Sequence, residues 1–310
     1  INLNGGTDTL TLAAGNNTLS VSNVETITGG TGNDTVTLGT VKTSGVVDLN
    51  GGTDTLVLFN DNNSFTVSDT ETITGGTGND AITLGSLQSS GTVIDLNGGS
   101  DSLTLANGAN TLSVSDVELI TGGSGNDSIT LGTVQTSGTT IDLNGGTDTL
   151  ILANGANTLS IADVETITGG TGTDTIALAD GGQTVSGISA VETVTGGSGN
   201  DTVTYTAAQT SGVVDLNGGT DTLVLANANN SFTVSDTETI TGGTGNDTVT
   251  LGTAQTSGTV DLNGGTDTLV LFNDNNSFTV SDTETITGGS GNDTITLGST
   301  QVSGTVIDLN

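Results

Sequence analysis

The stretch of sequence that decides the fold reads Gly29-Gly30-Thr31-Gly32-Asn33-Asp34-Thr35-Val36-Thr37. Paired glycines reach backbone conformations with φ > 0, so they allow a tight turn whose carbonyl oxygens point into one concavity. Asp34 adds a charged oxygen to that turn. The β-branched residues that follow favour a strand, in which the valine faces inward and the threonines face outward. The nine residues therefore predict a turn that carries a carboxylate, followed by the start of a strand.

The same loop recurs along the chain. This long loop, Gly-Gly-x-Gly-x-Asp, begins at Gly29, Gly75, Gly122, Gly169, Gly196, Gly242 and Gly288, at intervals of 46, 47, 47, 27, 46 and 46 residues. A short loop, Gly-Gly-Thr/Ser-Asp, lies between the long loops and begins at Gly5, Gly51, Gly98, Gly145, Gly218 and Gly264. Successive double glycines are about 22 to 24 residues apart, apart from the longer interval between Gly169 and Gly196, and a fixed period of this length is typical of solenoid repeats.

The repeat predicts an all-β fold, a parallel β-solenoid of about 13 coils, each about 22–24 residues long, in which long-loop and short-loop coils alternate. Residues 1–310 are expected to form a single repetitive segment of a longer chain, with an irregular 27-residue coil at 169–195. Helical repeats are excluded, because no window has a 3.6-residue apolar period and Thr, Gly, Asn and Val dominate the composition.

Equivalent positions of successive coils should stack into apolar ladders. With a coil of about 22–24 residues, Ile27 is expected to lie over Leu49 and Ile73, and Val36 over Leu56 and Ile82. These ladders would form the core.

Composition limits both the fold and the function. With 50 glycines, five phenylalanines, one tyrosine and no tryptophan, 310 residues cannot fill one broad globular core, whereas a solenoid buries a few apolar residues per coil. The absence of cysteine and histidine leaves only oxygen ligands, which suit hard cations such as calcium. The 34 acidic residues against one basic residue disfavour nucleic acid and anionic membranes, and no apolar run approaches the roughly 20 residues of a membrane span. We therefore expect neither nucleic-acid binding nor membrane insertion.

Most acidic residues occupy repeating positions, including one aspartate in each loop. Carboxylates stacked about 4.8 Å apart repel one another, and a bound cation would remove that penalty. Alternatively, each aspartate folds back as an Asx turn to cap Gly or Thr backbone N–H groups, which needs no metal. The motif favours a cation in the long loops, whereas both interpretations stay open for the short loops. The remaining acids, such as Glu25, Asp48 and Asp116, are expected to be solvated or to cap.

The long loops resemble the nonapeptide repeats of RTX proteins, and the chain also resembles the β-strand-repeat surface proteins of bacteria, of adhesin, S-layer or sheath type. The resemblance implies Ca²⁺ as the cofactor and a secreted, extracellular or cell-surface location. By the same resemblance, the ligands would be the carboxylates of the long-loop aspartates and the carbonyl oxygens of the loop glycines. The aspartates are Asp34, Asp80, Asp127, Asp174, Asp201, Asp247 and Asp293. The glycines are Gly30, Gly76, Gly123, Gly170, Gly197, Gly243 and Gly289. The short-loop aspartates would be second-coil partners, namely Asp8, Asp54, Asp101, Asp148, Asp221 and Asp267.

Two other functions compete with a structural role. Parallel β-helices also host polysaccharide-acting enzymes, but catalysis needs one differentiated site, and the chain offers only repeated carboxylates. Lys42 stands where other repeats have glutamine, so we expect it on a solvated face and predict no enzyme. Ice binding or adhesion through outward threonine ladders, as in Thr35 and Thr37, is the second alternative.

The sequence thus predicts an extracellular structural element, such as a stalk, sheath, surface layer or filament, that calcium rigidifies. The chain opens at Ile1-Asn2-Leu3-Asn4 and closes at Ile307-Asp308-Leu309-Asn310, both within a repeat. We therefore expect either covalent continuation of the repeat or head-to-tail self-association, with contacts to extracellular surfaces or polysaccharide as further partners.

Overall fold

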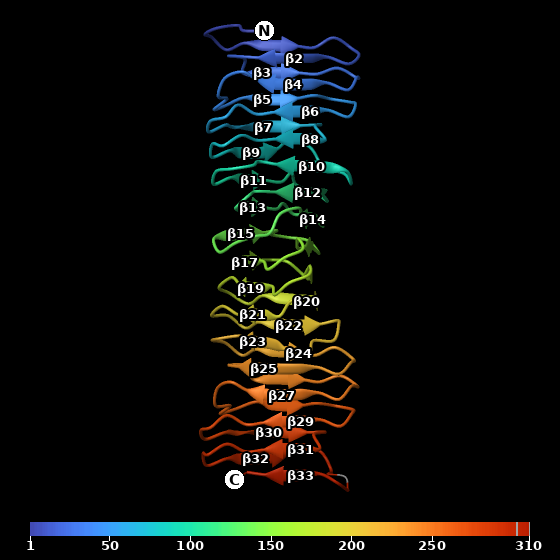
Figure 1. Cartoon of the computed structure of the whole chain (residues 1–310), viewed down its shortest axis with the longest axis vertical. Helices are drawn as coiled ribbons and strands as arrows, with labels where there is room; N and C mark the ends of the chain where they lie inside the picture. The colour runs from blue at the N-terminus through green and yellow to red at the C-terminus, as the bar shows by residue number, and fades with distance from the viewer. Residues whose placement is uncertain (302, 310) are drawn as a thin grey trace. The chain divides into compact units, whose positions relative to one another are not determined.

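The computed structural model describes residues 1–301 and 303–309, so Asn310 at the expected head-to-tail junction lies outside the described residues. The chain divides into two compact units, Ile1–Ala153 and Asn154–Asn310. Each unit is an all-β parallel solenoid, and the coils number about 15 in all (Figure 1). Over the described part of the chain, no helix has the length and apolar character needed to cross a membrane.

Unit 1 consists of two parallel sheets that take alternate strands of the chain. One sheet contains β1 (Thr9–Thr11), β3 (Thr26–Thr28), β5 (Val46–Asp48), β7 (Ser64–Ser68), β9 (Ala81–Leu84), β11 (Ser102–Thr104), β13 (Leu119–Thr121) and β15 (Thr139–Asp142). The other contains β2 (Thr18–Val21), β4 (Thr35–Leu38), β6 (Thr55–Val57), β8 (Thr72–Thr74), β10 (Thr92–Asp95), β12 (Thr111–Ser115), β14 (Ser128–Leu131) and β16 (Thr149–Ile151). A coil is therefore two strands and two turns.

Unit 2 is built in the same way. One sheet contains β17 (Thr158–Ala162), β19 (Thr175–Leu178), β21 (Thr193–Thr195), β23 (Gly212–Asp215), β25 (Ser231–Ser235), β27 (Thr248–Leu251), β29 (Thr268–Val270), β31 (Thr285–Thr287) and β33 (Val306–Asp308). The other contains β18 (Thr166–Thr168), β20 (Thr184–Ser189), β22 (Thr202–Tyr205), β24 (Thr222–Val224), β26 (Thr239–Thr241), β28 (Thr259–Asp261), β30 (Ser277–Ser281) and β32 (Thr294–Leu297).

The coil is shorter than the sequence predicts. Thr9 pairs with Thr26, and Ala81 pairs with Ser102. The hydrogen bonds next to these pairs, from Asp8 N to Glu25 and from Asp80 N to Asp101, span 17 residues and 21 residues. The longer coil predicted from the double glycines is wrong, because double glycines mark only some of the turns. The turn around Lys42 also reverses the chain fully, although it has no double glycine.

An odd number of strands per repeat replaces the predicted alternation of two coil types. The 46-residue repeat that starts at Thr26 contains five strands, β3 to β7, and the next Thr-Ile-Thr strand is β8. Because five strands make two and a half coils, β3 and β8 lie in different sheets. In unit 2 the 27-residue interval contains three strands, β19 to β21, so Gly169 and Gly196 also follow strands of different sheets. Its irregularity is a register shift in β20 between Val185 and Ile188.

The core lies between the two sheets of each unit. Val36 pairs with Leu56, as predicted, but Leu56 then pairs with Ile73. Ile27 pairs with Leu10 and Val47, so the predicted ladder that joins Ile27 to Leu49 and Ile73 is wrong. Full burial of such side chains stabilises the fold by about 1.5–3 kcal/mol each.

The predicted stacking of Val36 over Ile82 fails for the same reason. Ile82 pairs with Phe65 and Leu103 in the sheet of β7, β9 and β11. A shorter coil changes the pairing partner at every step, while the inward orientation of each apolar residue is preserved.

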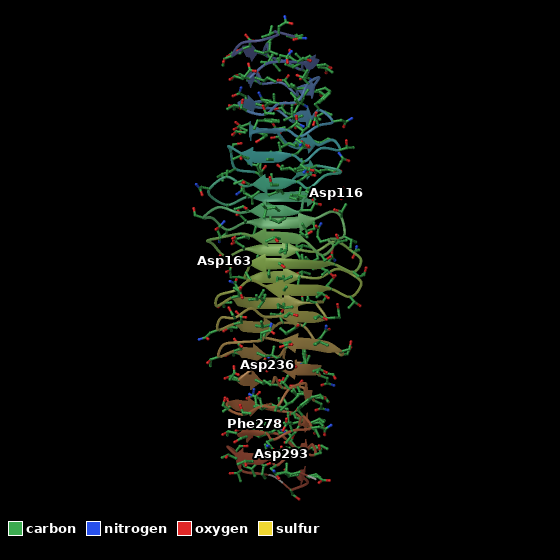
Figure 2. All side chains as sticks on the ribbon, turned by 90° about the vertical axis from the view of Figure 1, so that its left-hand side faces the viewer. Asp116, Asp163, Asp236, Phe278 and Asp293 are labelled. Carbon is green, nitrogen blue, oxygen red and sulfur yellow. The ribbon has the colours of Figure 1, made fainter. Side chains whose placement is uncertain are left out.

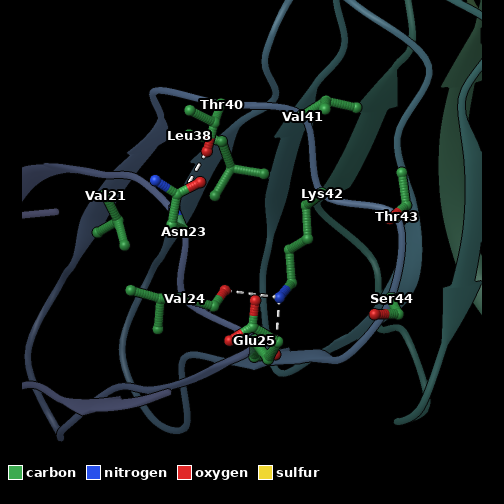
Figure 3. A pocket seen from close by; sticks show the side chains of 10 residues that line it. All are labelled: Val21, Asn23, Val24, Glu25, Leu38, Thr40, Val41, Lys42, Thr43 and Ser44. Carbon is green, nitrogen blue, oxygen red and sulfur yellow. Dashed lines mark hydrogen bonds between the residues drawn. The ribbon is translucent and has the colours of Figure 1, made fainter. Parts of the chain in front are cut away.

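Lys42 is buried, so its predicted place on a solvated face is wrong. The side chain is 6% exposed, and its Nζ donates hydrogen bonds to the carbonyl oxygens of Val24 at 2.9 Å and Glu25 at 2.6 Å (Figure 3). The ammonium also lies 5.6 Å from the ring centroid of Phe65. Burial lowers the pKa of Lys42, and the nearby charge of Glu25 opposes this shift. Gln209 occupies the position equivalent to Lys42, and its Nε2 donates a hydrogen bond to the carbonyl oxygen of Val191, the equivalent of Val24. This position therefore places a hydrogen-bond donor inside the solenoid.

Candidate metal sites

The long-loop aspartates accept hydrogen bonds from the backbone, and all of them are buried except Asp293, which is half-buried. Asp34 is 1% exposed, and its Oδ1 accepts from Asn17 N at 2.8 Å and Asn17 Nδ2 at 2.7 Å. Its Oδ2 accepts a longer bond from Gly30 N at 3.3 Å. A backbone or side-chain donor of the preceding coil bonds Oδ1 in the same way at Asp80, Asp127, Asp174, Asp201, Asp247 and Asp293. The contact that every long loop shares comes from the preceding coil. The predicted cap on a glycine of the same loop forms at Asp34, Asp127, Asp174, Asp201 and Asp247, whereas Oδ2 of Asp80 and of Asp293 is buried without a partner.

The glycine carbonyls predicted as ligands face the following coil. Gly30 O accepts from Gly51 N at 3.2 Å, which ties the long loop to the short loop stacked on it. The carbonyls of Gly76, Gly123, Gly197 and Gly243 accept from the matching short-loop glycines in the same way. Gly170 N donates to Asp174 Oδ2 at 3.1 Å, as Gly30 N does to Asp34 Oδ2, and a Cβ on Gly289 would overlap the carbonyl oxygen of Phe272. A carbonyl oxygen has two lone pairs, so one hydrogen bond leaves it able to bind a cation.

Four hydrogen bonds connect a long loop to the short loop of the following coil at five places in the chain. At the first pair they are Asp34 N to Asp54 Oδ1 at 2.6 Å, Gly51 N to Gly30 O at 3.2 Å, Thr53 N to Asn33 Oδ1 at 3.0 Å and Asn50 Nδ2 to Gly29 O at 2.8 Å. The same four bonds occur where short loops begin at Gly98, Gly145, Gly218 and Gly264. Long and short loops thus form five equivalent two-loop units.

The second short-loop glycine makes a close backbone approach. A Cβ on Gly52 would overlap the carbonyl oxygen of Gly32, so only glycine fits there. Its φ of 155° also favours glycine. The short loop therefore lies directly against the third glycine of the long loop, and carbonyl and carboxylate oxygens of both loops come together.

The short-loop aspartates carry buried oxygens that lack a hydrogen-bond partner. Asp54, Asp101, Asp221 and Asp267 are at most 2% exposed, and Oδ2 of each has no partner. Oδ2 of Asp8 is also buried without a partner, and Asp148 accepts from Asp127 N through Oδ1. Burying a carboxylate without a partner is costly unless it is neutralised by a proton or a cation.

This burial appears in the pKa values of the short-loop aspartates. Burial raises the pKa of Asp101 and of Asp267 to about 6, against the opposing hydrogen bonds from Asp80 N and Asp247 N. The pKa values of Asp54 and Asp221 are raised for the same reason. These carboxyl groups therefore keep their protons to a higher pH than exposed ones do.

Side chains alone do not form a metal site. Among residues 1–301 and 303–309, no group of three or more acidic side chains is placed to hold a metal ion. Calcium binds six to eight oxygens and accepts backbone carbonyls readily. The two-loop unit supplies carboxylates from both loops and glycine carbonyls, so its donor set fits calcium when the carbonyls are included.

Two members of the arrangement were not singled out by sequence as site residues. Along one edge of unit 1, Asn17 N donates to Asp34 Oδ1, Asp34 N to Asp54 Oδ1, and Asp54 N to Glu71 Oε2 at 2.8 Å. Asn17, Asp34, Asp54 and Glu71 thus form a file, which is a row of residues linked from coil to coil by hydrogen bonds. Asn17 begins the file and Glu71 ends it. The signal in the sequence is the spacing of successive members, 17 or 20 residues, which equals one coil.

The corner acids lie beside such files. Asp69 and Asp116 each stand two residues before a glutamate that ends a file, Glu71 or Glu118, and their charges contribute to the raised pKa of Asp54 and Asp101. Asp116 is half-buried on a loop beside the strands (Figure 2), and its N–H donates to Thr133 Oγ1 at 3.0 Å. Burial raises the pKa of Asp116, and the neighbouring Asp95 adds to this. Its φ of 51° is a left-handed conformation that Asp tolerates in turns.

Comparison with known proteins identifies the repeat. The family model described as RTX calcium-binding nonapeptide repeat (4 copies) matches residues 1–20, 22–40, 65–86, 115–133, 186–204, 232–253 and 278–299. Six of these segments contain a complete long loop, and the loop at Gly169 lies in none of them. Neither the comparison with curated proteins nor the comparison with solved structures found a match. These repeats bind calcium, so Ca²⁺ is the cofactor that the match supports. Seven segments of the chain, spread between residues 1 and 299, thus match RTX calcium-binding nonapeptide repeats.

Proposed function

We propose that the chain is an extracellular structural element, of the stalk, sheath, surface-layer or filament kind, that calcium rigidifies. The observation that carries the proposal is the buried, unpartnered Oδ2 of four short-loop aspartates, each stacked on a long-loop aspartate, namely Asp54, Asp101, Asp221 and Asp267. Calcium would supply the positive charge that these carboxylates lack. Proteins with RTX repeats are typically secreted, which supports the extracellular location.

The residues that would hold calcium at the first unit are Asp34 and Asp54, with glycine carbonyls of both loops. Their hydrogen bonds already fix the two loops against each other, so little chain ordering would remain when an ion binds. Because an ion that binds only the folded state stabilises it by mass action, calcium would raise the stability of the stacked coils.

The test compares calcium-depleted and calcium-saturated protein by far-UV circular dichroism and thermal melting. We expect calcium to raise the melting temperature, because it neutralises buried carboxylates. If removal of calcium changes neither the β content nor the melting temperature, the proposal is refuted. Magnesium is the control ion, because it requires near-octahedral geometry at shorter distances.

Ice binding is a second candidate, and one observation favours it. In unit 1, Thr18, Thr35, Thr55 and Thr72 stand in register on one sheet. Val93 interrupts the file at the next strand. Thermal hysteresis of the calcium-loaded protein would support this candidate, and normal freezing would exclude it.

Assembly and partners stay predictions. Head-to-tail self-association, covalent continuation of the repeat, and contacts with extracellular surfaces or polysaccharide follow from the proposed structural role. The formal net charge of −33 would oppose lateral clustering of chains at low salt. We propose no catalytic role.

A further inference from the structure

Resting on the proposed function, we propose that calcium binds only where a short loop is stacked on a long loop, and that the asparagine before the long-loop aspartate positions the short loop. The long loop at Gly169 therefore binds no ion, although it contains the aspartate and all three glycines of the motif.

The asparagine makes the same contact in all five two-loop units. Its Oδ1 accepts the N–H of the residue before the short-loop aspartate, at 2.9 to 3.0 Å. The asparagines are Asn33, Asn79, Asn126, Asn200 and Asn246. The side chain contacts the short loop rather than the candidate ligands, so it acts by positioning.

The loop at Gly169 differs in both of these features. Thr173 replaces the asparagine, and the following coil presents Ser189-Ala190-Val191-Glu192 in place of a short loop. Asp174 N donates to Glu192 Oε2 at 2.8 Å, and Gly169 N to Ser189 O at 2.9 Å. The positioning residue is thus missing at the long loop whose following coil lacks a short loop.

The carboxylates at this exception are also satisfied without a cation. Asp174 Oδ1 accepts from Asn157 N and Nδ2, and its Oδ2 accepts from Gly170 N at 3.1 Å. The neighbouring coil contributes Glu192, whose Oε2 has a donor. In the two-loop units, by contrast, the neighbouring coil contributes an aspartate such as Asp101, whose buried Oδ2 has no partner. A cation at Asp174 would therefore have fewer unpartnered carboxylate oxygens to neutralise than a cation at a two-loop unit.

The test counts calcium ions in the full chain by isothermal titration of calcium-depleted protein. Asp127→Asn changes a two-loop unit, Asp174→Asn changes the exception, and Asp116→Asn is the charge-matched control outside the loops. We expect Asp127→Asn to lose one ion, and the other two variants to keep the number of the unaltered protein. Loss of one ion in Asp174→Asn as well would overturn the inference while the proposed function stands. If the unaltered chain binds no calcium, both proposals fail.

A second pair of variants tests the positioning role. Asn126→Ala removes the bond to Thr147 N at 3.0 Å and should weaken one site about 2- to 10-fold, the effect of one hydrogen bond. Asn126→Asp retains an oxygen acceptor and should restore the affinity. Equal affinity of all sites in Asn126→Ala would overturn the assignment of this residue.

Discussion

Two adjacent glycines allow a direct test of loop stacking. Gly146 has a φ of 158°, and a Cβ there would overlap the carbonyl oxygen of Gly125. The nearest atom to a Cβ on Gly145 is Ser124 Cα, at 3.9 Å. Gly146→Ala should push the short loop away from the long loop and destabilise the fold by about 2–4 kcal/mol, from overpacking and backbone strain. Gly145→Ala should change stability by less than about 1 kcal/mol, since the position has room and alanine restricts the unfolded chain.

The assay is urea unfolding of both variants, with and without calcium, together with a count of bound ions. Both variants keep Asp127 and Asp148, so a difference between them reports the stacking of the loops rather than a lost ligand. Gly146→Ala should also lose one ion, because its two loops no longer meet. Equal stability and equal ion counts in the two variants would refute the close approach of Gly146 to Gly125.

Two further predictions concern titrating groups. Because burial raises the pKa of Asp101 and Asp267 to about 6, calcium-free protein should be most stable near pH 4 and should lose stability as the pH rises through about 6. Thermal melting between pH 4 and 7.5 measures this, and a melting temperature that rises over that range would contradict it. Because burial lowers the pKa of Lys42, raising the pH towards 10.5 should stabilise the unaltered protein relative to Lys42→Gln, since the folded state releases the lysine proton more easily. Urea midpoints of both proteins at pH 7 and pH 10 test this, and a difference that is independent of pH would show that Lys42 is not buried.

The sequence predicts the local structure well, because turn and strand are encoded within a few residues. The nine residues from Gly29 to Thr37 contain the turn and the start of β4, and Val36 faces the core as predicted. The all-β solenoid follows from the repetition of this unit. The long-loop and short-loop aspartates were also identified as candidates, since their type and spacing are visible in the sequence.

The coil length and the place of Lys42 could not be read in the same way. The turn around Lys42 is closed by contacts between coils, such as Lys42 N to Asn63 Oδ1 at 3.1 Å, and not by a local glycine pair. Its ammonium group donates hydrogen bonds to the carbonyl oxygens of Val24 and Glu25, which belong to the preceding coil. Such partners become visible only when the register is known. The same holds for the short loop, whose role depends on which loop it stacks upon.

The odd number of strands per repeat determines how far apart the bound calcium ions would lie. In unit 1 the loops at Gly29 and Gly122 follow β3 and β13, so ten strands, or five coils, separate them on one edge. At about 4.8 Å per coil this separation is about 24 Å, roughly three Debye lengths at physiological ionic strength. The loop at Gly75 follows β8, in the other sheet, and lies at the opposite edge. An even number of strands, four or six, would instead place every loop on one edge about 10–14 Å apart, where divalent ions repel one another more strongly. Five strands per repeat therefore spread the bound charge over both edges, so that calcium can fasten the turns on both sides of the core.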